Sequence, residues 1–378
     1  MPAPRAEVSI RNLQGAARRS QPRASGGAAG RRVRASQTGL HDFELDLVAA
    51  VLSVHDDEPV IEVLPPGVSR DFEQLPAVTF QPGAGRNLEE TLRQPVSLET
   101  GHAIGYLQQL VAFKTSQPLD PERILIGYLA LVNDKRHRIR TRPASRVHPR
   151  ISRWQGCYLY LPWEDWRGGR PAAIDSVILP ALAKWSRATT ATARVKAASK
   201  AALNRLQAER SARVRLAFGS AGAAWAEEKV LARFELLAEA GLVAEESPLT
   251  GGGTAEPLRS SAQSAGRPAS ALGRPMVPGH RRILAAGLGR LRSDLQQRPV
   301  VFELMEDSFT LFELQRTVEI ILGPHLHKQN FRRLIETTGL VEPTGRLKSH
   351  TGGRPAQLYR FRRDVLLERP GPGVQGLA

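Results

Sequence analysis

The sequence is poor in cysteine, in aromatic residues and in acidic residues. Its single cysteine, Cys157, excludes a disulfide framework and a cysteine-rich zinc site. No apolar run approaches the roughly 20 residues that a membrane span needs, and the first residues lack the apolar segment of a secretory signal. Lys and Arg number 53 against 37 Asp and Glu, which gives a net charge of +16. We therefore expect a cytoplasmic protein with no membrane partner and with a polyanionic partner, nucleic acid first of all.

The basic residues are concentrated in three blocks. Residues 1–38 hold eight Arg against one Glu, residues 184–215 hold nine Lys and Arg against one Glu, and residues 324–363 hold nine against two Glu. The stretch 41–134 is mildly acidic instead. This division indicates one part of the chain that touches nucleic acid and another part that does not.

The first block has the composition of a disordered basic tail. Residues 1–38 are rich in Arg, Ala, Gly and Ser and show no periodicity. Two alternatives stay open: an organelle transit peptide, which is also Arg-rich and acid-poor, and a start codon assigned too early. Hydrophobic residues make up 41% of the whole chain, which is enough for a folded core in the rest of it.

The next segment, residues 42–165, predicts a mixed α/β domain. A helix over LEETLRQPVSLETG either begins near Pro95 or kinks there, and Gly101 ends it. Aromatic residues close the domain in CYLYLPWEDW. Apolar segments rich in β-formers predict strands at 43–54, 59–64, 105–113 and 123–132, the first two joined by a turn at 55–59.

Helices are predicted in the middle of the chain. Residues 174–245 are rich in Ala and Arg, and apolar residues recur at helical spacing until Gly241. Residues 247–279 have the Gly, Ser and Pro content of a linker. A further helix is predicted at 280–297.

The C-terminal pattern predicts a winged helix-turn-helix. A helix over 308–323, capped by Ser308 or Thr310, ends at Gly323-Pro324, and a second helix over 325–339 follows at once. A strand over 340–345, a basic Gly-rich loop and a strand over 357–361 then complete a basic hairpin.

The second helix has the division of faces that a recognition helix needs. Phe331, Leu334, Ile335 and Thr338 share one side, with His327 beside them, and polar residues take the other side. The alternative is that these charges form only a solvated face. His325 and His327 have no third metal ligand nearby, so we expect no metal site. The predicted DNA-binding residues are Lys328, Gln329, Asn330, Arg332, Arg333, Arg346, Lys348 and Arg354.

The segments HKQNFRRLIETTGLVEPTG and TGGRPAQLYRFRR resemble the C-terminal winged helix of Nudix-related transcriptional regulators of NAD metabolism. Upstream, TGHAIGYLQQLVAFKT and RILIGYLALV resemble the central strands of the family's Nudix-like domain. The segment PWEDWRGGRP is similar to the alphaproteobacterial branch that represses de novo NAD synthesis. The resemblance implies a bacterial repressor of NAD biosynthesis genes that binds a palindromic operator as a homodimer.

An active Nudix enzyme needs a helix with Arg-Glu-hydrophobic-x-Glu-Glu-x-Gly, whose carboxylates hold divalent ions. In the corresponding stretch here, counted from Arg93, Gln94 replaces the first Glu and Ser97 with Leu98 replaces the pair. Counted back from Gly101, Glu99 is kept, but Leu98 replaces its partner and Pro95 takes the place of the first Glu. We therefore predict no catalytic residue, no metal and no catalytic cofactor.

The resemblance then implies a domain that senses a nucleotide such as NAD, ADP-ribose or ATP. Arg93, Tyr106, Gln109 and Phe113 lie beside the degenerate motif and are the candidate ligand-binding residues. The alternative is that Tyr106 and Phe113 are ordinary strand residues that face the core.

Two other features have plain structural interpretations. Trp163 and Trp166 flank Glu164-Asp165, and we interpret this segment as a packed aromatic turn rather than as a general acid and base. Cys157 lies among apolar residues, which indicates a buried thiol.

Two alternatives to a DNA-binding regulator stay open. The first is an active Nudix diphosphohydrolase with an appended nucleic-acid module, which would need the missing glutamates. The second is an RNA-binding protein, although no stacking platform is evident: only Phe331, Tyr359 and Phe361 lie in the C-terminal region, and the first is a core position.

The predicted fold class is a degenerate Nudix-like α/β/α sandwich followed by a helical region and a C-terminal winged helix-turn-helix. The helices at 181–245 and 280–297 are candidates for the surface that couples sensing to DNA binding. The predicted divisions are a basic tail (1–38), a Nudix-like sensor domain (39–170), a helical region (171–246), a flexible linker (247–279), a connecting helix (280–300), a winged-helix domain (301–368) and a tail (369–378).

Overall fold

The computed structural model divides the chain into two units, Met1–Leu40 and His41–Ala378. The predicted tails, the linker residues 247–268 and Arg354 lie outside the part that the structure describes. Within that part, no helix is both long and apolar enough to cross a membrane. The structure describes residues 43–66, 72–81, 87–115, 122–137, 152–188, 200–246, 269–324, 326–349 and 355–364.

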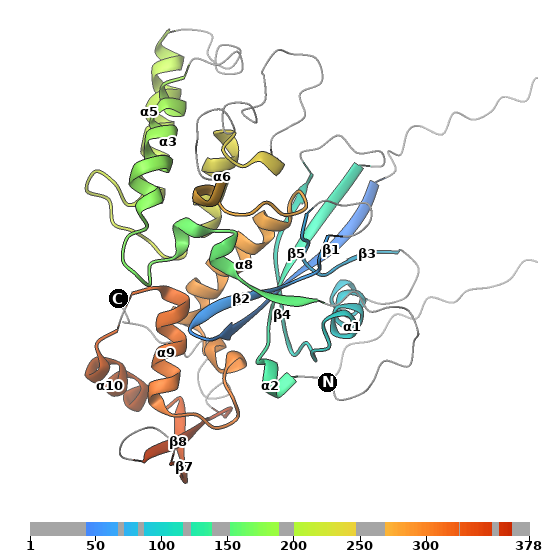
Figure 1. Ribbon diagram of the computed structural model, residues 1–378, viewed down its shortest axis with the longest axis vertical. Coiled ribbons are helices and arrows are strands. Elements are labelled where there is room, and N and C mark those ends of the chain that lie inside the picture. Colours follow the sequence, from blue (N-terminus) through green and yellow to red (C-terminus); the bar gives the residue numbers. More distant parts are fainter. Residues whose placement is uncertain are drawn as a thin grey trace, which may run out of the picture. The chain divides into compact units, whose positions relative to one another are not determined.

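A mixed sheet forms the centre of the second unit (Figure 1). Its strand order is β4-β5-β1-β2-β6, and β3 pairs with β1. The central strands β1 and β5 run parallel from Phe43 beside Glu122 to Leu52 beside Leu131. The four strands predicted from apolar runs are confirmed. The strands are β1 (Phe43–His55), β2 (Glu58–Val63), β3 (Ala77–Thr79), β4 (Tyr106–Lys114), β5 (Glu122–Leu131) and β6 (Arg153–Gly156).

The turn between β1 and β2 is a two-residue hairpin, as the sequence predicts. Asp56 and Asp57 have φ angles of 44° and 62°. Aspartate tolerates this left-handed region, and such turns match the twist of paired strands. The hairpin brings the carboxylate of Asp57 to the C-terminal part of the chain.

Helix α1 (Leu88–Thr100) covers one face of the sheet. The side chain of Asn87 accepts a hydrogen bond from the amide of Glu90, and Gly101 ends the helix with a φ of 74°. Of the two alternatives for Pro95, a start of the helix there is wrong, because the helix begins at Leu88 and continues through the proline.

Helix α8 (His280–Gln297) covers the opposite face, so the predicted connecting helix is the third layer of an α/β/α sandwich (Figure 1). It lies very close to the strands. A Cβ atom on Gly127 would lie 3.0 Å from the side chain of Ile283, and one on Gly287 would lie 3.2 Å from the Cβ atom of Ala50. Glycine at both positions lets strand and helix backbones approach each other.

The predicted helical region is confirmed over its described residues, and it packs on α8 through α6. The aromatic turn before it is also confirmed, because Trp163 is fully buried. This region contains a π-helical turn (Ile174–Ile178), α3 (Leu179–Arg187), α5 (Lys200–Phe218) and α6 (Val230–Glu239), and short turns lie at Cys157–Leu159, Pro162–Glu164, Ala244–Glu246 and Ala269–Leu272.

The C-terminal residues form two helices and a two-stranded hairpin, in the predicted order. They pack on α8 and on the β2 side of the sheet. The predicted fold class is therefore correct in all three of its parts. The C-terminal elements are a turn (Val300–Leu304), α9 (Leu311–Leu322), α10 (Lys328–Thr338), β7 (Val341–Lys348) and β8 (Ala356–Phe361), and the short α2 (Asp134–His137) follows β5.

Candidate nucleic-acid interface

The first helix of the C-terminal module, α9, is capped at both ends. Of the two candidate caps, Thr310 is the one used: its hydroxyl accepts from the Glu313 amide at 3.2 Å, and the Glu313 carboxylate accepts from the Thr310 amide at 2.8 Å. This reciprocal capping satisfies two amides that the helix leaves free. Gly323, with a φ of 100°, ends the helix.

The second helix, α10, presents one face to the core and the other to solvent. Phe331 and Ile335 are each 1% exposed, and Leu334 is half-buried against the same core. The expected position of His327 beside these residues is wrong, since its side chain is exposed. His327 is the N-cap with extended backbone angles, so the helical wheel does not apply to it.

The predicted contact residues of α10 share its exposed surface. Within the described ranges, the charged groups of Lys328, Arg332 and Arg333 form no ion pair or hydrogen bond, and the side chains of Gln329 and Asn330 are exposed beside them. An amphipathic helix with unpaired cations and amides on its outer face can offer both phosphate and base-edge contacts.

The hairpin is attached to the helices by a small aromatic group. Phe309 and Tyr359 exchange two backbone hydrogen bonds of 2.9 and 2.7 Å, which form an isolated antiparallel bridge to β8. The ring of Phe302 stacks on Phe361 with centroids 4.2 Å apart. The hairpin is thus held in a fixed place relative to α9 and α10, as a wing must be.

The predicted wing cations differ in their surroundings. The side chain of Arg346 is exposed. The ammonium of Lys348 instead lies 2.5 Å from the carboxylate of Glu313, the capping residue of α9. This contact with Lys348 contributes to a pKa of Glu313 below its ordinary value, although burial acts in the opposite direction. Lys348 therefore has to leave a carboxylate before it can reach a phosphate.

Ion pairs also join the module to the sheet. Arg316 of α9 forms a bidentate pair with Asp57 in the β1–β2 turn, at 3.0 and 3.1 Å, and its hydrogen bond lowers the pKa of Asp57. On the other side, Lys135 lies 3.0 Å from Glu306. A cavity of about 390 Å³ lies at the Lys135–Glu306 pair, and residues of both the sheet and the module line it.

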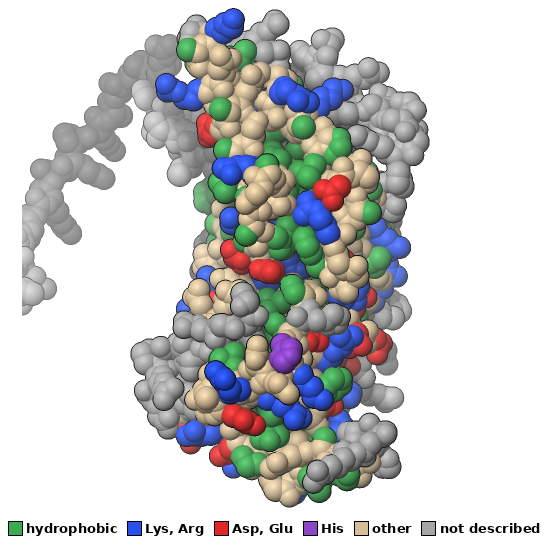
Figure 2. Space-filling view, turned by 90° about the vertical axis from the view of Figure 1, so that its left-hand side faces the viewer, with side chains coloured by type: hydrophobic (Ala, Val, Ile, Leu, Met, Phe, Trp, Pro, Cys, Tyr) green, Lys and Arg blue, Asp and Glu red, His purple; other side chains and the backbone are tan. Residues whose placement is uncertain are grey.

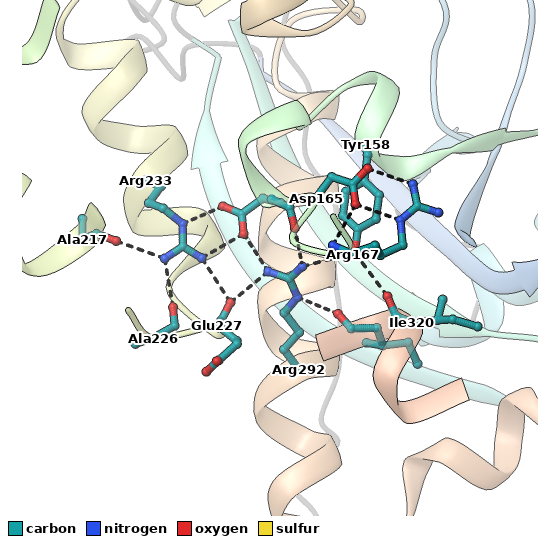
Figure 3. Close-up of polar contacts among 11 residues, drawn as sticks. Tyr158, Asp165, Arg167, Ala217, Ala226, Glu227, Arg233, Arg292 and Ile320 are labelled. Atoms are coloured by element: carbon teal, nitrogen blue, oxygen red, sulfur yellow. Dashed lines mark hydrogen bonds and ion pairs between the residues drawn. The ribbon is translucent and has the colours of Figure 1, made fainter. Parts of the chain in front are cut away.

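In the interior of the protein, two arginines share the carboxylate of Glu164 in a buried cluster (Figure 3). Arg233 of α6 and Arg292 of α8 each approach the Glu164 carboxylate at 2.6 Å, and all three side chains are at most 1% exposed. Arg233 also donates to the carbonyl of Ala217 at 3.0 Å, and Arg292 donates to the carbonyl of Ile321 at 2.9 Å. The last turns of α5 and α9 are thus bound to the same cluster.

The sequence interpretation missed this cluster. A signal was present, because Arg233 and Arg292 each interrupt an apolar helical run, and Glu164 lies between two tryptophans. Buried charges of this kind are normally paired, so each arginine predicted a buried acceptor. Only the fold shows which acceptor it is.

A second buried polar group lies at the end of the sheet near α2. The ring of His102 lies between Glu62, 3.2 Å from Nδ1, and Asp134, 2.7 Å from Nε2. Burial lowers the pKa of His102, but the two carboxylates outweigh this effect and the net shift is upward.

The predicted ligand-binding residues do not come together. The guanidinium of Arg93 donates to the carbonyls of Ile104 and Gly105, which ties α1 to the start of β4. Tyr106 and Phe113 pack on the side of the sheet that faces α8. The hydroxyl of Tyr106 contacts Gln108 at 2.7 Å, and burial raises its pKa to about 12.

Phe113 lies under the guanidinium of Arg282, 4.8 Å from its ring centre. Gln109 is exposed and pairs with Tyr128 across the two strands. The alternative that Tyr106 and Phe113 pack against the core thus agrees with their places in the structure.

Two remaining predictions concern reactive groups. Cys157 is fully buried, as predicted, and burial raises the pKa of its thiol. On α1, the glutamates Glu89 and Glu90 lie in the first turn, away from the positions that the Nudix spacing requires. Among the described residues, no three His, Cys, Asp or Glu side chains lie close enough to hold a metal ion.

The fold and this surface define a class, a winged helix joined to an α/β/α sandwich. Residues 301–361 match the family model of the NrtR DNA-binding winged helix domain. The resemblance of the C-terminal module to Nudix-related transcriptional regulators is thereby confirmed.

Relatives match the chain to different extents. The ADPR responsive transcriptional repressor NtrR of Acinetobacter baylyi is 44% identical over 82 residues, which are 22% of this chain. The matched part spans only 32% of that curated relative. A solved structure of Shewanella oneidensis NrtR complexed with a 27mer DNA is 16% identical, covers 85% of this chain and 94% of that one, and superposes with a TM-score of 0.47. A MutT/nudix family protein of Enterococcus faecalis is 11% identical, with 85% and 89% of the two chains covered and a TM-score of 0.42.

Proposed function

We propose that the protein is a sequence-specific DNA-binding transcriptional regulator that acts in the cytoplasm. The observation that carries this proposal is the exposed face of α10, where Lys328, Arg332 and Arg333 have no ion-pair partner among the described residues, in a module that matches a DNA-binding family model. In such a module the second helix enters the major groove and the hairpin contacts the backbone. The contact set is Lys328, Gln329, Asn330, Arg332, Arg333, Arg346, Lys348 and Arg354.

The regulated genes are those of NAD biosynthesis, and the effect is repression. The relative from Acinetobacter baylyi, by its name, is a repressor that responds to ADPR. For this chain we propose an effector nucleotide of the same kind: ADP-ribose, NAD or ATP. The sandwich is its receptor, with Arg93, Tyr106, Gln109 and Phe113 as the first positions to test.

The sandwich senses its nucleotide without hydrolysing it. Divalent-ion catalysis on a diphosphate needs clustered carboxylates. Counted from Arg93, α1 has none of the three motif glutamates, and counted back from Gly101 it keeps only Glu99. The protein therefore needs no catalytic cofactor, and the nucleotide acts as a signal.

The domain boundaries follow the proposed roles. The sensor comprises residues 39–170, the helical region 171–246, and the winged helix 301–368, with 280–300 packed on the sensor. Two copies bind a palindromic operator, since twofold dimers place two recognition helices about one turn of DNA apart. A nucleotide that favours one arrangement of the sheet and the module changes this spacing through contacts such as Arg316–Asp57.

The test is a DNA-binding titration with the whole chain. The probes are duplexes from NAD-synthesis promoters and from the region upstream of its own gene, with excess competitor DNA and with or without NAD, ADP-ribose and ATP. We expect saturable binding that survives the competitor and changes with one nucleotide. The double variant Arg332→Gln/Arg333→Gln should lose more than about tenfold in affinity for the specific duplex.

The matched control is Lys114→Gln/Arg298→Gln, which removes two exposed charges from β4 and from the end of α8. It should leave specific binding unchanged. Binding that disappears with competitor at every site would overturn the proposal, and release of phosphate-containing products from ADP-ribose would overturn the non-catalytic role.

A further inference from the structure

Helix α5 has little buried surface for its length. Of its 19 residues only Val214, Ala217 and Phe218 are buried, all near its C-terminal end. A helix that is polar on nearly all sides gains little from packing, so its outer residues are free to serve another purpose. The rest of α5 lies along α3, where Arg210 covers the ring of Trp185 at 4.5 Å.

The outer surface of this helical pair is strongly basic. Arg213 of α5 is paired with Glu239 at 2.6 Å, but five other cations of the helical pair are exposed and form no ion pair with any residue in the described ranges. Glu209 is the only acidic residue of α5 itself. Figure 2 shows Lys and Arg side chains on this face of the molecule, over α3 and α5 above and over α10 below. The exposed cations of α3 and α5 are Lys184, Arg187, Lys200, Arg205 and Arg215.

We propose that the exposed cations of α3 and α5 form a second DNA-binding surface, which contacts the phosphate backbone of the duplex beyond the site held by the winged helix. This inference rests on the proposed function, because it assumes that α10 brings a duplex to the protein. The surface has no sequence preference, since point charges on long side chains read phosphates and not base edges.

Duplex DNA fits this surface better than other polyanionic partners. The helix has no apolar face that could enter a lipid headgroup layer, which a membrane-binding helix requires. The helical pair offers no free aromatic ring for single-stranded bases, because Arg210 of α5 covers the ring of Trp185 in α3. Lys200 and Arg215 lie about 22 Å apart along the helix axis, the length of about six base pairs.

The position of α5 relative to α9 is fixed by the buried cluster of Figure 3. Arg233 binds the carbonyl of Ala217 in the last turn of α5, and Arg292 binds the carbonyl of Ile321 in the last turn of α9. Both arginines share Glu164. A duplex bound by the winged helix is therefore presented to α5 in a constant orientation, as a second contact surface requires.

The experiment measures how DNA affinity depends on salt. The whole chain is titrated with a fluorescent duplex of about 40 base pairs of arbitrary sequence, between about 50 and 200 mM salt. The variant is Arg205→Gln/Arg215→Gln, in which glutamine keeps the helix propensity. Two lost phosphate contacts should reduce the slope of log affinity against log salt by about 1.8. The control Lys114→Gln/Arg298→Gln should keep the full slope.

The outcomes separate this inference from the proposed function. The tail 1–38 is present in every variant, so its contribution cancels. An unchanged slope for Arg205→Gln/Arg215→Gln, together with specific binding that Arg332→Gln/Arg333→Gln abolishes, would overturn the second surface and leave the regulator intact. Sedimentation of the same variant without DNA tests self-association. If Arg205→Gln/Arg215→Gln changes the sedimentation coefficient but leaves the salt slope unchanged, α5 is a self-association surface and the inference is overturned. If the wild-type chain shows no selective binding to any of the promoter duplexes, the proposed function is overturned instead.

Discussion

The winged helix and the sandwich differ in what they do with their polar side chains. On α10 the cations Arg332 and Arg333 point to solvent and are unpaired within the described residues. On α1 the candidate ligand-binding residue Arg93 donates from its guanidinium to two backbone carbonyls. The donors of the two α10 arginines are thus available to a ligand as the fold stands, whereas those of Arg93 would first have to leave the two carbonyls.

The two buried polar groups also differ in which parts of the fold they connect. The cluster around Glu164 joins both regions, because its arginines come from α6 and α8 and one of them reaches α9. The group around His102 lies between Glu62 and Asp134 and belongs to the sheet and α2. Changes at the first should affect the whole unit, and changes at the second should affect mainly the sandwich.

The largest effect is expected from Glu164→Ala. It leaves two buried guanidinium groups without a carboxylate, which should lower the free energy of unfolding by about 3–5 kcal/mol. Urea unfolding followed by tryptophan fluorescence measures this loss. The control is Asp165→Asn, whose partner Arg167 is part-exposed, and it should cost about 1 kcal/mol or less. Equal effects of the two variants would mean that the cluster does not join the regions.

A smaller effect tests the contrast between α1 and α10 directly. Arg93→Gln removes the donors of two carbonyls at a side chain that is 36% exposed, so it should lower the free energy of unfolding by about 1 kcal/mol. It should leave DNA affinity unchanged. If instead stability is unchanged and the response to the nucleotide disappears, Arg93 is a ligand-binding residue and the contrast is wrong.

The pH dependence of stability should come from the sandwich. The pKa of His102 is raised above 6.5 in the folded protein, so its protonated form favours folding. That contribution is complete below pH 6.5 and is lost as the pH rises through the raised pKa. Unfolding measured from about pH 6 to 9 should show this decrease, and His102→Gln should flatten it. A wild-type curve that rises over this range would contradict the assignment.

The smallest effect concerns the wing. Glu313→Gln keeps a capping side chain for Thr310 but releases Lys348 from its ion pair. One more free cation should raise the affinity for non-specific duplex by about two- to fivefold at low salt, with a steeper salt slope. A matched change on the hairpin, Glu342→Gln, frees Arg360 and serves as a comparison. No gain in either variant would mean that the wing does not meet phosphates.

Much of the winged helix was predictable because local signals define it. Thr310 with Glu313, Gly323 and Gly339 mark helix ends through backbone geometry, and the apolar spacing of Phe331 and Ile335 selects the buried face. The exception is His327, where the helical pattern was extended past the first residue with helical angles. The strands were predictable for a similar reason, as runs of β-formers bounded by turns.

The surroundings of the candidate ligand-binding residues were not predictable in the same way. Tyr106 and Phe113 lie beside the degenerate motif in sequence, but in the structure both face α8, away from the helix that carries the motif, because the irregularity between Gln109 and Ala112 puts two residues at an odd spacing on one side. Which side of the sheet each residue faces depends on the register of β4 with β5, and this register shifts between Gln109 and Ala112. Spacing along the chain does not contain that information.

The sequence by itself determined the positions of the longer helices and of β1, β2, β4 and β5, the winged-helix pattern and the surplus of positive charge, but not β3, β6 or α2. These features depend on backbone propensities, caps and periodicity, which act over a few residues. Only the tertiary structure decided that α8 is a layer of the sandwich, that Arg93 and Lys348 are engaged, and that Glu164 joins α6, α8 and α9. The reason is that pairing of buried charges depends on residues more than 60 positions apart, which meet only when the chain folds.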